Sequence, residues 1–170
     1  MPPFKFTRLF IPVLFLFFTT VSCSDDSGCN QKPNTAVNQA QLQLDIDEIE
    51  AYLSENSIEA QVHESGLRYV ISEPGDGNTA TLCDQITVRY EGRLMSDGSV
   101  FDDSDGKNIA FPFPLSRLII GWQVGIPLIE EGGSITLYVP SSYGYGGRGS
   151  GDDIPPNANL IFEISLVKVF

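Results

Sequence analysis

The chain has 170 residues, of which 42% are hydrophobic and 19% charged, which fits one globular domain with an appendage rather than a two-domain enzyme. Ten Lys and Arg residues stand against 22 Asp and Glu residues, and the net charge of −12 argues against nucleic acid as a partner because it repels phosphates. One His and three Cys residues supply little for a metal centre or a His-dependent triad, so we expect neither a metal nor a cofactor.

Residues 1–22 resemble the signal peptide of a bacterial lipoprotein. Lys5 and Arg8 precede an apolar run over residues 9–21, which is shorter than the roughly 20 residues that a membrane span needs. Cys23 follows at the position of the cysteine that is lipidated in such proteins. The resemblance implies an extracytoplasmic protein with a lipid anchor at Cys23 in the bacterial outer membrane, on its periplasmic or cell-surface face. An ordinary secretory signal, cut elsewhere, is the alternative.

Residues 23–36 have the polar, turn-forming composition of a linker, so we predict a tether there. If Cys23 carries lipid, Cys29 and Cys83 remain as an even pair in an oxidising compartment. A disulfide between them would tie the tether to the following domain. Two free thiols agree equally well with the sequence.

An acidic amphipathic helix is predicted over residues 37–60, with Asn34 or Thr35 as its N-terminal cap. Its apolar residues recur at spacings of four, three and four: Leu42, Ile46, Ile49 and Leu53. Residues 41–60 carry six acids and no base. Because one narrow stripe forms only a weak coiled coil, we expect it to pack against the neighbouring domain. A weak dimer through this helix, or an envelope docking face on it, is the alternative to a monomer.

From residue 64 to residue 170 the sequence changes to short alternating apolar runs separated by glycine, proline and Asp-Gly turns. We predict strands at residues 67–71, 86–94, 111–113, 134–140 and 160–170. Residues 118–126 predict a short buried helix that Pro127 stops. The predicted fold class is therefore α+β, with an antiparallel sheet of about five strands wrapped around one short helix and preceded by the N-terminal helix.

Two motif matches fail on their context. Residues 144–149 match the G-x-G-x-x-G pattern but lead into a glycine- and proline-rich segment, whereas a dinucleotide site needs the pattern to open a helix. A calcium loop over residues 101–112 would place Phe101 and Pro112 where carboxylates are required.

Five motifs occur in a fixed order along the domain: Tyr90-x-Gly92, Asp97-Gly98-x-x-Phe101-Asp102, Ile119-x-Gly121-Trp122, Tyr143-Gly144-Tyr145-Gly146 and Ile154-Pro155-Pro156-Asn157-Ala158-x-Leu160-x-Phe162. The series resembles the FKBP-type peptidyl-prolyl cis-trans isomerases over about residues 66–170. The resemblance implies rotation of X-Pro bonds in exported proteins, with proline-containing polypeptides as substrates and macrolides as possible inhibitors. A non-catalytic proline-peptide-binding or chaperone-like module of the cell envelope is the alternative.

The resemblance also implies roles for individual residues. Tyr145 would donate its hydroxyl to a substrate carbonyl, Asp102 would be the single charged group of the pocket, and Phe101 would line the side facing that carbonyl. The remaining residues would hold the proline ring, with Trp122 as the floor: Tyr90, Phe111, Leu118, Ile119, Trp122, Ile154 and Phe162.

Such a pocket needs no acid, base or metal. Rotating a peptide bond costs about 18–20 kcal/mol because resonance gives the C–N bond double-bond character. The planar amide is more dipolar than the twisted transition state, so an apolar, water-poor cavity disfavours the ground state relative to the transition state. Each tenfold of rate then requires about 1.4 kcal/mol of differential stabilisation.

Overall fold

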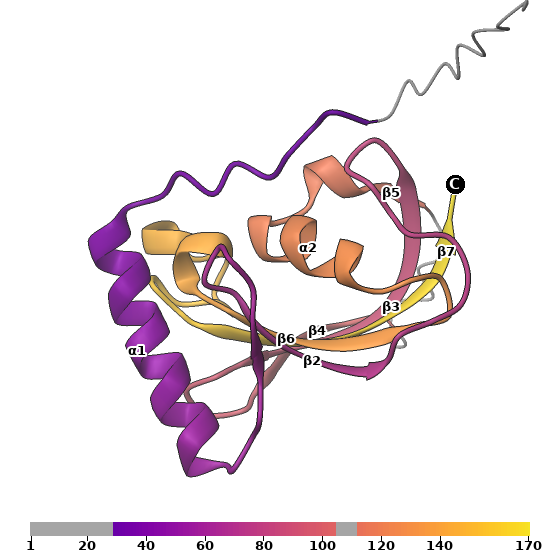
Figure 1. The fold of residues 1–170 in the computed structure, drawn as a ribbon. Helices are drawn as coiled ribbons and strands as arrows, with labels where there is room; N and C mark the ends of the chain where they lie inside the picture. The colour runs from indigo at the N-terminus through magenta and orange to yellow at the C-terminus, as the bar shows by residue number, and fades with distance from the viewer. Residues whose placement is uncertain (1–28, 105–111) are drawn as a thin grey trace, which may run out of the picture.

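The computed structural model describes residues 29–104 and 112–170 of the chain. The predicted signal peptide, the predicted lipidation site Cys23 and the pocket residue Phe111 lie outside the described residues. The described part forms one antiparallel sheet with a short helix, α2 (Ile120–Gly125), on one face and a longer helix, α1 (Gln39–Glu55), at its side (Figure 1). The predicted α+β class, with a sheet wrapped around one short helix, is confirmed.

Within the described residues the sheet has seven strands: β1 (Gln61–Val62), β2 (Arg68–Glu73), β3 (Gln85–Leu94), β4 (Val100–Asp103), β5 (Phe113–Pro114), β6 (Ser134–Val139) and β7 (Leu160–Val169). They run in the order β1-β2-β6-β7-β3-β4, and β5 pairs with β3 beside that path. The prediction of about five strands was too low because β1 and β4 were missed. Both are short strands at the ends of the sheet, where few residues alternate between a buried and an exposed face.

Helix α2 lies directly on strand β6. A Cβ atom added at Gly121 would lie 2.6 Å from the Val139 side chain, and one added at Gly125 would lie 2.6 Å from Leu137. Only glycine permits this separation between helix and sheet. The helix spans fewer residues than predicted, and Pro127 does not stop the helical path at once. It lies instead in a 3-10 turn, η2 (Ile126–Leu128), where proline lacks no needed donor.

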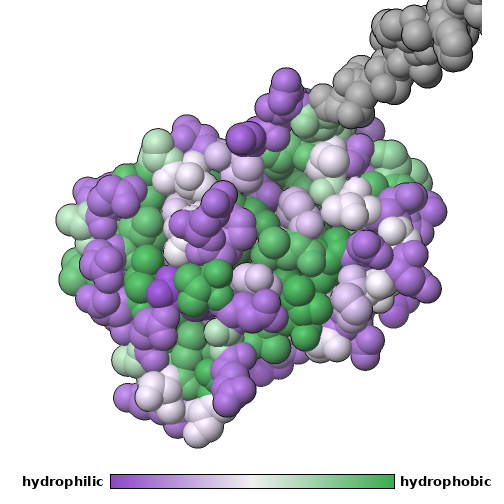
Figure 2. All heavy atoms as spheres, viewed as in Figure 1, coloured by the Kyte–Doolittle hydropathy of each residue, from purple (hydrophilic) through white to green (hydrophobic). Residues whose placement is uncertain are grey.

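Helix α1 begins and ends inside its predicted bounds. Asn38, rather than Asn34 or Thr35, caps its start, and Asn38 Oδ1 accepts hydrogen bonds from the backbone N–H groups of Ala40 and Gln41. The helix stops at Glu55 because Ser57 adopts a left-handed conformation with φ of 55°. The outward side of α1 is mostly hydrophilic (Figure 2).

The apolar stripe of α1 packs against the chain's own domain, as predicted. Leu137 faces α2, so the next residue along β6, Tyr138, faces the opposite side of the sheet. There Tyr138 and Ile161 form a cluster with Ile49 and Leu53 of α1. The helix therefore covers one end of the sheet face that α2 leaves open.

A disulfide joins Cys29 to Cys83, with the two Cα atoms 5.7 Å apart. It ties the segment preceding α1 to the loop between β2 and β3, so the alternative of two free thiols is not the one that the structure shows. Closing a loop of this length restricts the unfolded chain and stabilises the fold by about 4 kcal/mol in the chain-entropy account. Across the described ranges no helix has the length and apolar character needed to cross a membrane.

Candidate active site

A cavity of about 320 Å³ opens between α2 and the sheet. Six separate segments supply its wall. Strands β3, β4 and β7 form the sheet side, and α2 with the flanking loops forms the opposite side. The lining residues are Val88, Tyr90, Phe101, Asp102, Phe113, Arg117, Leu118, Ile119, Trp122, Tyr145 and Phe162.

Four aromatic rings form a continuous edge-to-face chain in the cavity wall. The ring centroid of Trp122 lies 5.0 Å from that of Tyr90 and 5.3 Å from that of Phe162. Phe162 in turn meets Phe101 at 5.6 Å, and the three interplanar angles lie between 78° and 88°. Each such pair adds about 0.5–1.5 kcal/mol beyond the area that it buries. The rings therefore hold one another in place and make this part of the cavity wall apolar.

Gly92 makes this ring packing possible. A Cβ atom at this position would lie 2.6 Å from the Phe101 ring and 2.8 Å from the Phe162 ring. Real Cβ atoms do not approach other atoms so closely, so any larger residue would push the two rings apart. The Tyr-x-Gly spacing in β3 thus places a ring and the gap for two others on the same side of one strand.

Two tyrosine hydroxyls supply the polar groups beside the rings. The Tyr90 hydroxyl donates a hydrogen bond of 2.8 Å to Asp102 Oδ2. Burial raises the pKa of Tyr90 well above its usual range, and the hydrogen bond and charge of Asp102 raise it further. Burial and the same carboxylate also raise the pKa of Tyr145. Both phenols therefore remain protonated and can donate. Tyr145 lines the cavity and is 38% exposed as a residue, so it is accessible to a ligand.

The structure brings together eight of the ten residues that the sequence assigned to the pocket: Tyr90, Phe101, Asp102, Leu118, Ile119, Trp122, Tyr145 and Phe162. Phe111 lies outside the described residues. Ile154 does not line the cavity. It is only 6% exposed, and a backbone bridge to Ser150 holds it in the hydrophobic core rather than at the rim.

Three lining residues were missed by the sequence analysis. Val88 lies two positions before Tyr90, so strand alternation already places both side chains on one face. Phe113 is the last residue of the predicted strand over residues 111–113. No sequence pattern pointed to Arg117. Because Arg117 also lines the cavity, Asp102 is not its single charged group, contrary to the prediction. The Trp122 indole N–H was also unforeseen as a buried donor without a hydrogen-bond partner among the described residues.

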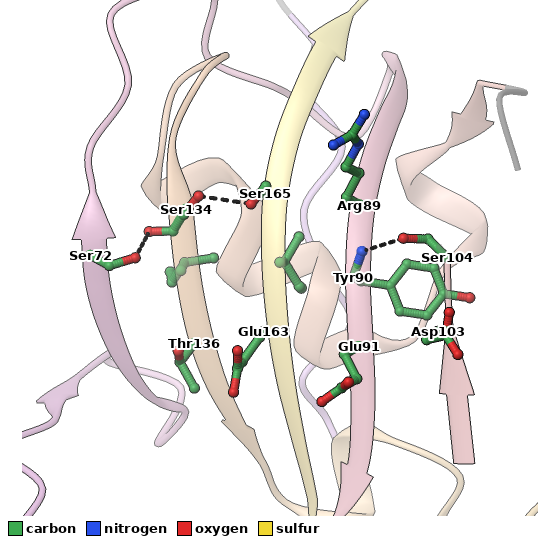
Figure 3. Close-up of a pocket in the computed structure, with 12 residues that line it drawn as sticks. Ser72, Arg89, Tyr90, Glu91, Asp103, Ser104, Ser134, Thr136, Glu163 and Ser165 are labelled. Atoms are coloured by element: carbon green, nitrogen blue, oxygen red, sulfur yellow. Dashed lines mark hydrogen bonds between the residues drawn. The ribbon is translucent and has the colours of Figure 1, made fainter. Parts of the chain in front are cut away.

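A second hollow, of about 360 Å³, lies on the opposite face of the sheet (Figure 3). Hydroxyl groups from adjacent strands line one end of it, where Ser134 Oγ lies 2.8 Å from Ser165 Oγ and Ser72 Oγ donates to the Ser134 carbonyl oxygen. Glu91 lies directly opposite Glu163 at the other end. This hollow has no ring cluster to receive a proline. Over residues 29–104 and 112–170, no three His, Cys, Asp or Glu side chains are placed to share a metal ion.

Sequence comparisons relate the chain to known peptidyl-prolyl isomerases. The family described as FKBP-type peptidyl-prolyl cis-trans isomerase matches residues 77–167. A probable FKBP-type peptidyl-prolyl cis-trans isomerase FkpA from Neisseria meningitidis is 47% identical over 122 residues, which are 71% of this chain and 44% of that protein. The outer membrane protein MIP of Legionella longbeachae is 37% identical over 122 residues, which are 71% of this chain and 52% of that protein. The chain thus spans about half the length of these curated relatives.

The fold agrees as well. The crystal structure of FkpA from Escherichia coli superposes with a TM-score of 0.65 at 34% identity, over 77% of this chain and 63% of that one. The matched residues 77–167 include the four rings, Asp102 and Tyr145. On this sequence match and this architecture, the chain belongs to the FKBP-type peptidyl-prolyl cis-trans isomerase family.

Proposed function

We propose that this protein catalyses cis–trans isomerisation of X-Pro peptide bonds in polypeptides of the bacterial cell envelope. The observation that carries the proposal is the rigid cluster of four edge-to-face rings around a cavity of about 320 Å³, with a carboxylate and two protonated phenols at its side. X-Pro bonds interconvert over tens to hundreds of seconds without a catalyst, which is slow enough to limit folding.

The cavity would favour rotation in two ways, by removing water from the substrate amide and by donating a hydrogen bond to a substrate carbonyl. A proline ring seated on Trp122 would bring the preceding amide out of water, which removes solvation that stabilises the planar, dipolar form. Tyr145 would donate its hydroxyl to a substrate carbonyl and hold one side of the amide while the other turns. Asp102 keeps the Tyr90 hydroxyl fixed, so the polar edge of the cavity is preorganised before a substrate arrives.

The test is the rate of isomerisation of a short X-Pro peptide with the full chain, purified in a mild detergent. We expect acceleration above the spontaneous rate, and we expect Asp102→Ala and Tyr145→Phe to reduce it. Tyr138→Phe is the matched control, because this buried tyrosine packs against Tyr52 and α1 on the other face of the sheet. Saturable peptide binding with no acceleration in the unsubstituted protein would contradict the proposal.

We also propose that lipidation of Cys23 anchors the protein in the outer membrane. The support is the lipoprotein-like sequence before Cys23, the disulfide typical of an oxidising compartment, and the name of the Legionella relative as an outer membrane protein. In bacteria expressing the gene, Cys23→Ala should move the protein from the membrane fraction to the soluble fraction of the envelope. Cys29→Ala, six residues along the chain, should leave it in the membrane fraction. Retention of both variants in the membrane would contradict a lipid at Cys23.

A further inference from the structure

A buried hydrogen-bond network connects α1 to the loop that carries Tyr145. The loop follows β6 and begins with a 3-10 turn, η3 (Ser141–Tyr143). The described residues contain four buried polar or charged residues, and three of them belong to this network: Asp45 at 1% exposed, Ser141 at 0% and Asn159 at 7%. Polar groups are concentrated at this one junction between the helix and the loop.

Asp45 forms the centre of the network. Its Oδ2 atom accepts three hydrogen bonds from the turn, from Ser141 Oγ at 2.8 Å, from the Ser142 backbone N–H at 3.0 Å and from Ser142 Oγ at 3.0 Å. Its Oδ1 atom accepts a fourth from Gln41 Nε2 within α1, at 2.8 Å. Hydrogen bonds to a carboxylate are about twice as strong as those between neutral groups. One side chain of α1 therefore fixes both the backbone and the hydroxyls of the turn.

Asn159 supports the same turn from the other side. Its Oδ1 atom accepts from the Ser141 backbone N–H at 2.9 Å, and its Nδ2 atom donates to Glu48 Oε2 of α1 at 2.8 Å. The Tyr143 hydroxyl donates to the Ser65 carbonyl oxygen at 2.7 Å. The turn is thus held by Asp45 directly and by Glu48 through Asn159, so two side chains of α1 take part. Tyr145, only two residues after the turn, is half-exposed and takes its position from this loop.

The stability of the helix does not require a buried carboxylate. The stripe of α1 already buries Leu42, Ile49 and Leu53, and an apolar residue in place of a buried charge is often neutral or stabilising. What the carboxylate does, and an apolar side chain cannot do, is bind the two hydroxyls and the N–H of the turn in one geometry.

We propose that Asp45 is a positioning residue for the isomerase site, which sets the place of the Tyr145 hydroxyl through the turn Ser141–Tyr143. The proposal rests on the proposed isomerase function. It makes the N-terminal helix a part of the catalytic machinery rather than a separate appendage. A displacement of a reacting group by about 1 Å can cost up to a hundredfold in rate, so a loosened turn has a measurable effect.

The experiment compares kcat and KM for the full chain in the peptide assay. Asp45→Ala should lower kcat about tenfold with a smaller change in KM. Asp45→Asn should retain most of the activity, because its amide oxygen can accept the three hydrogen bonds from the turn, although its NH2 group cannot accept the one from Gln41. Asp47→Ala is the matched control. It removes the same charge and the same kind of Gln–Asp bond within α1, from Gln43 at 2.8 Å, but Asp47 does not contact the turn.

A double-mutant cycle with Tyr145→Phe separates positioning from general destabilisation. If Asp45 acts through the Tyr145 hydroxyl, Asp45→Ala should have little further effect in the Tyr145→Phe background. Equal loss in both backgrounds, or no loss in a folded Asp45→Ala protein, would overturn the proposal. If Asp45→Ala does not fold, Ser142→Ala takes its place in the cycle, with an expected loss of about threefold. An inactive unsubstituted protein would overturn the proposed function itself, so the two failures are distinguishable.

Discussion

The two faces of strand β3 produce two hollows of similar size and opposite chemistry. Val88 and Tyr90 point toward α2 and line the cavity of about 320 Å³, where they meet aromatic rings. Arg89 and Glu91 point the other way and line the hollow of about 360 Å³, where they meet hydroxyls and carboxylates. Alternation along one strand, rather than a separate domain, generates both surfaces.

The two hollows are similar in volume and differ in the side chains that line them, so lining rather than size sets which one fits the proposed isomerase function. A peptide lying in the outer hollow would exchange water for hydroxyl and carboxylate groups, so its planar amide would remain well solvated. Under the proposed function, a proline in the inner cavity would meet rings and lose that solvation, which would lower the barrier to rotation. We expect substitutions on the inner face to change catalysis, and those on the outer face to change only stability.

The largest expected effect comes from making the inner wall polar. Phe101→Ser removes the last ring of the edge-to-face chain and admits water beside the amide, so we expect kcat/KM to fall about a hundredfold, equivalent to about 2.7 kcal/mol. Val100→Ser, at the preceding position of β4, is the control because Val100 is 49% exposed. A similar loss in both variants, each shown to be folded by circular dichroism, would refute the distinction between the faces.

A smaller effect is expected on substrate choice. Arg117 borders the inner cavity, so a substrate with Glu before proline should be favoured over one with Lys by about threefold through their charges. Arg117→Gln should abolish this preference, measured as the ratio of the two kcat/KM values. Arg89→Gln removes the same charge from the outer hollow and should leave the ratio unchanged. A change of the ratio in Arg89→Gln alone would reverse the assignment of the two faces.

Tyr90 borders both hollows, and the pH dependence of stability should show that its phenol lies buried beside Asp102. Burial, followed by the hydrogen bond and charge of Asp102, raises the pKa of Tyr90 in the folded protein. The unfolded chain therefore loses this proton first, at about pH 10, and the stabilisation that is complete below that pH is lost as the pH rises further. Tyr90→Phe should lose less Tm than the unsubstituted protein between about pH 9 and pH 11. An equal fall in Tm in both proteins would mean that the Tyr90 phenol is solvent-exposed and that its pKa is not raised by folding.

The sequence predicted the inner face better than the rest of the molecule. Tyr90, Trp122 and Phe162 were assigned to the pocket by the ordered motifs that resemble the isomerase family, and the structure places all three in the cavity wall. The long strands β3 and β7 were predicted from their apolar runs, and the structure pairs them along their whole length.

The features that the sequence did not predict depend on contacts between residues that lie far apart in the chain. Asp45 is one of six acids among residues 41–60, and no local signal shows that its partners Ser141 and Ser142 lie 96 and 97 residues further on. Ile154 was expected at the rim and is buried instead, and Arg117 was not expected in the cavity wall, because exposure at a rim depends on loop geometry, which composition does not specify. The disulfide also remained open, since only the folded chain brings Cys29 and Cys83 together.

The smallest effect is expected on the outer face. Glu163 lies directly opposite Glu91 on β3, and like charges in this position destabilise a sheet. Glu163→Gln should therefore raise the free energy of unfolding by ~0.3 kcal/mol, with kcat/KM unchanged. The gain should shrink at about 1 M salt, where exposed charges are screened. Glu131→Gln is the control and should lower the free energy of unfolding. Glu131 accepts a hydrogen bond of 2.9 Å from Lys168, and the substitution removes the charge of this pair. A fall in kcat/KM for Glu163→Gln, without loss of fold, would mean that the outer hollow takes part in catalysis after all.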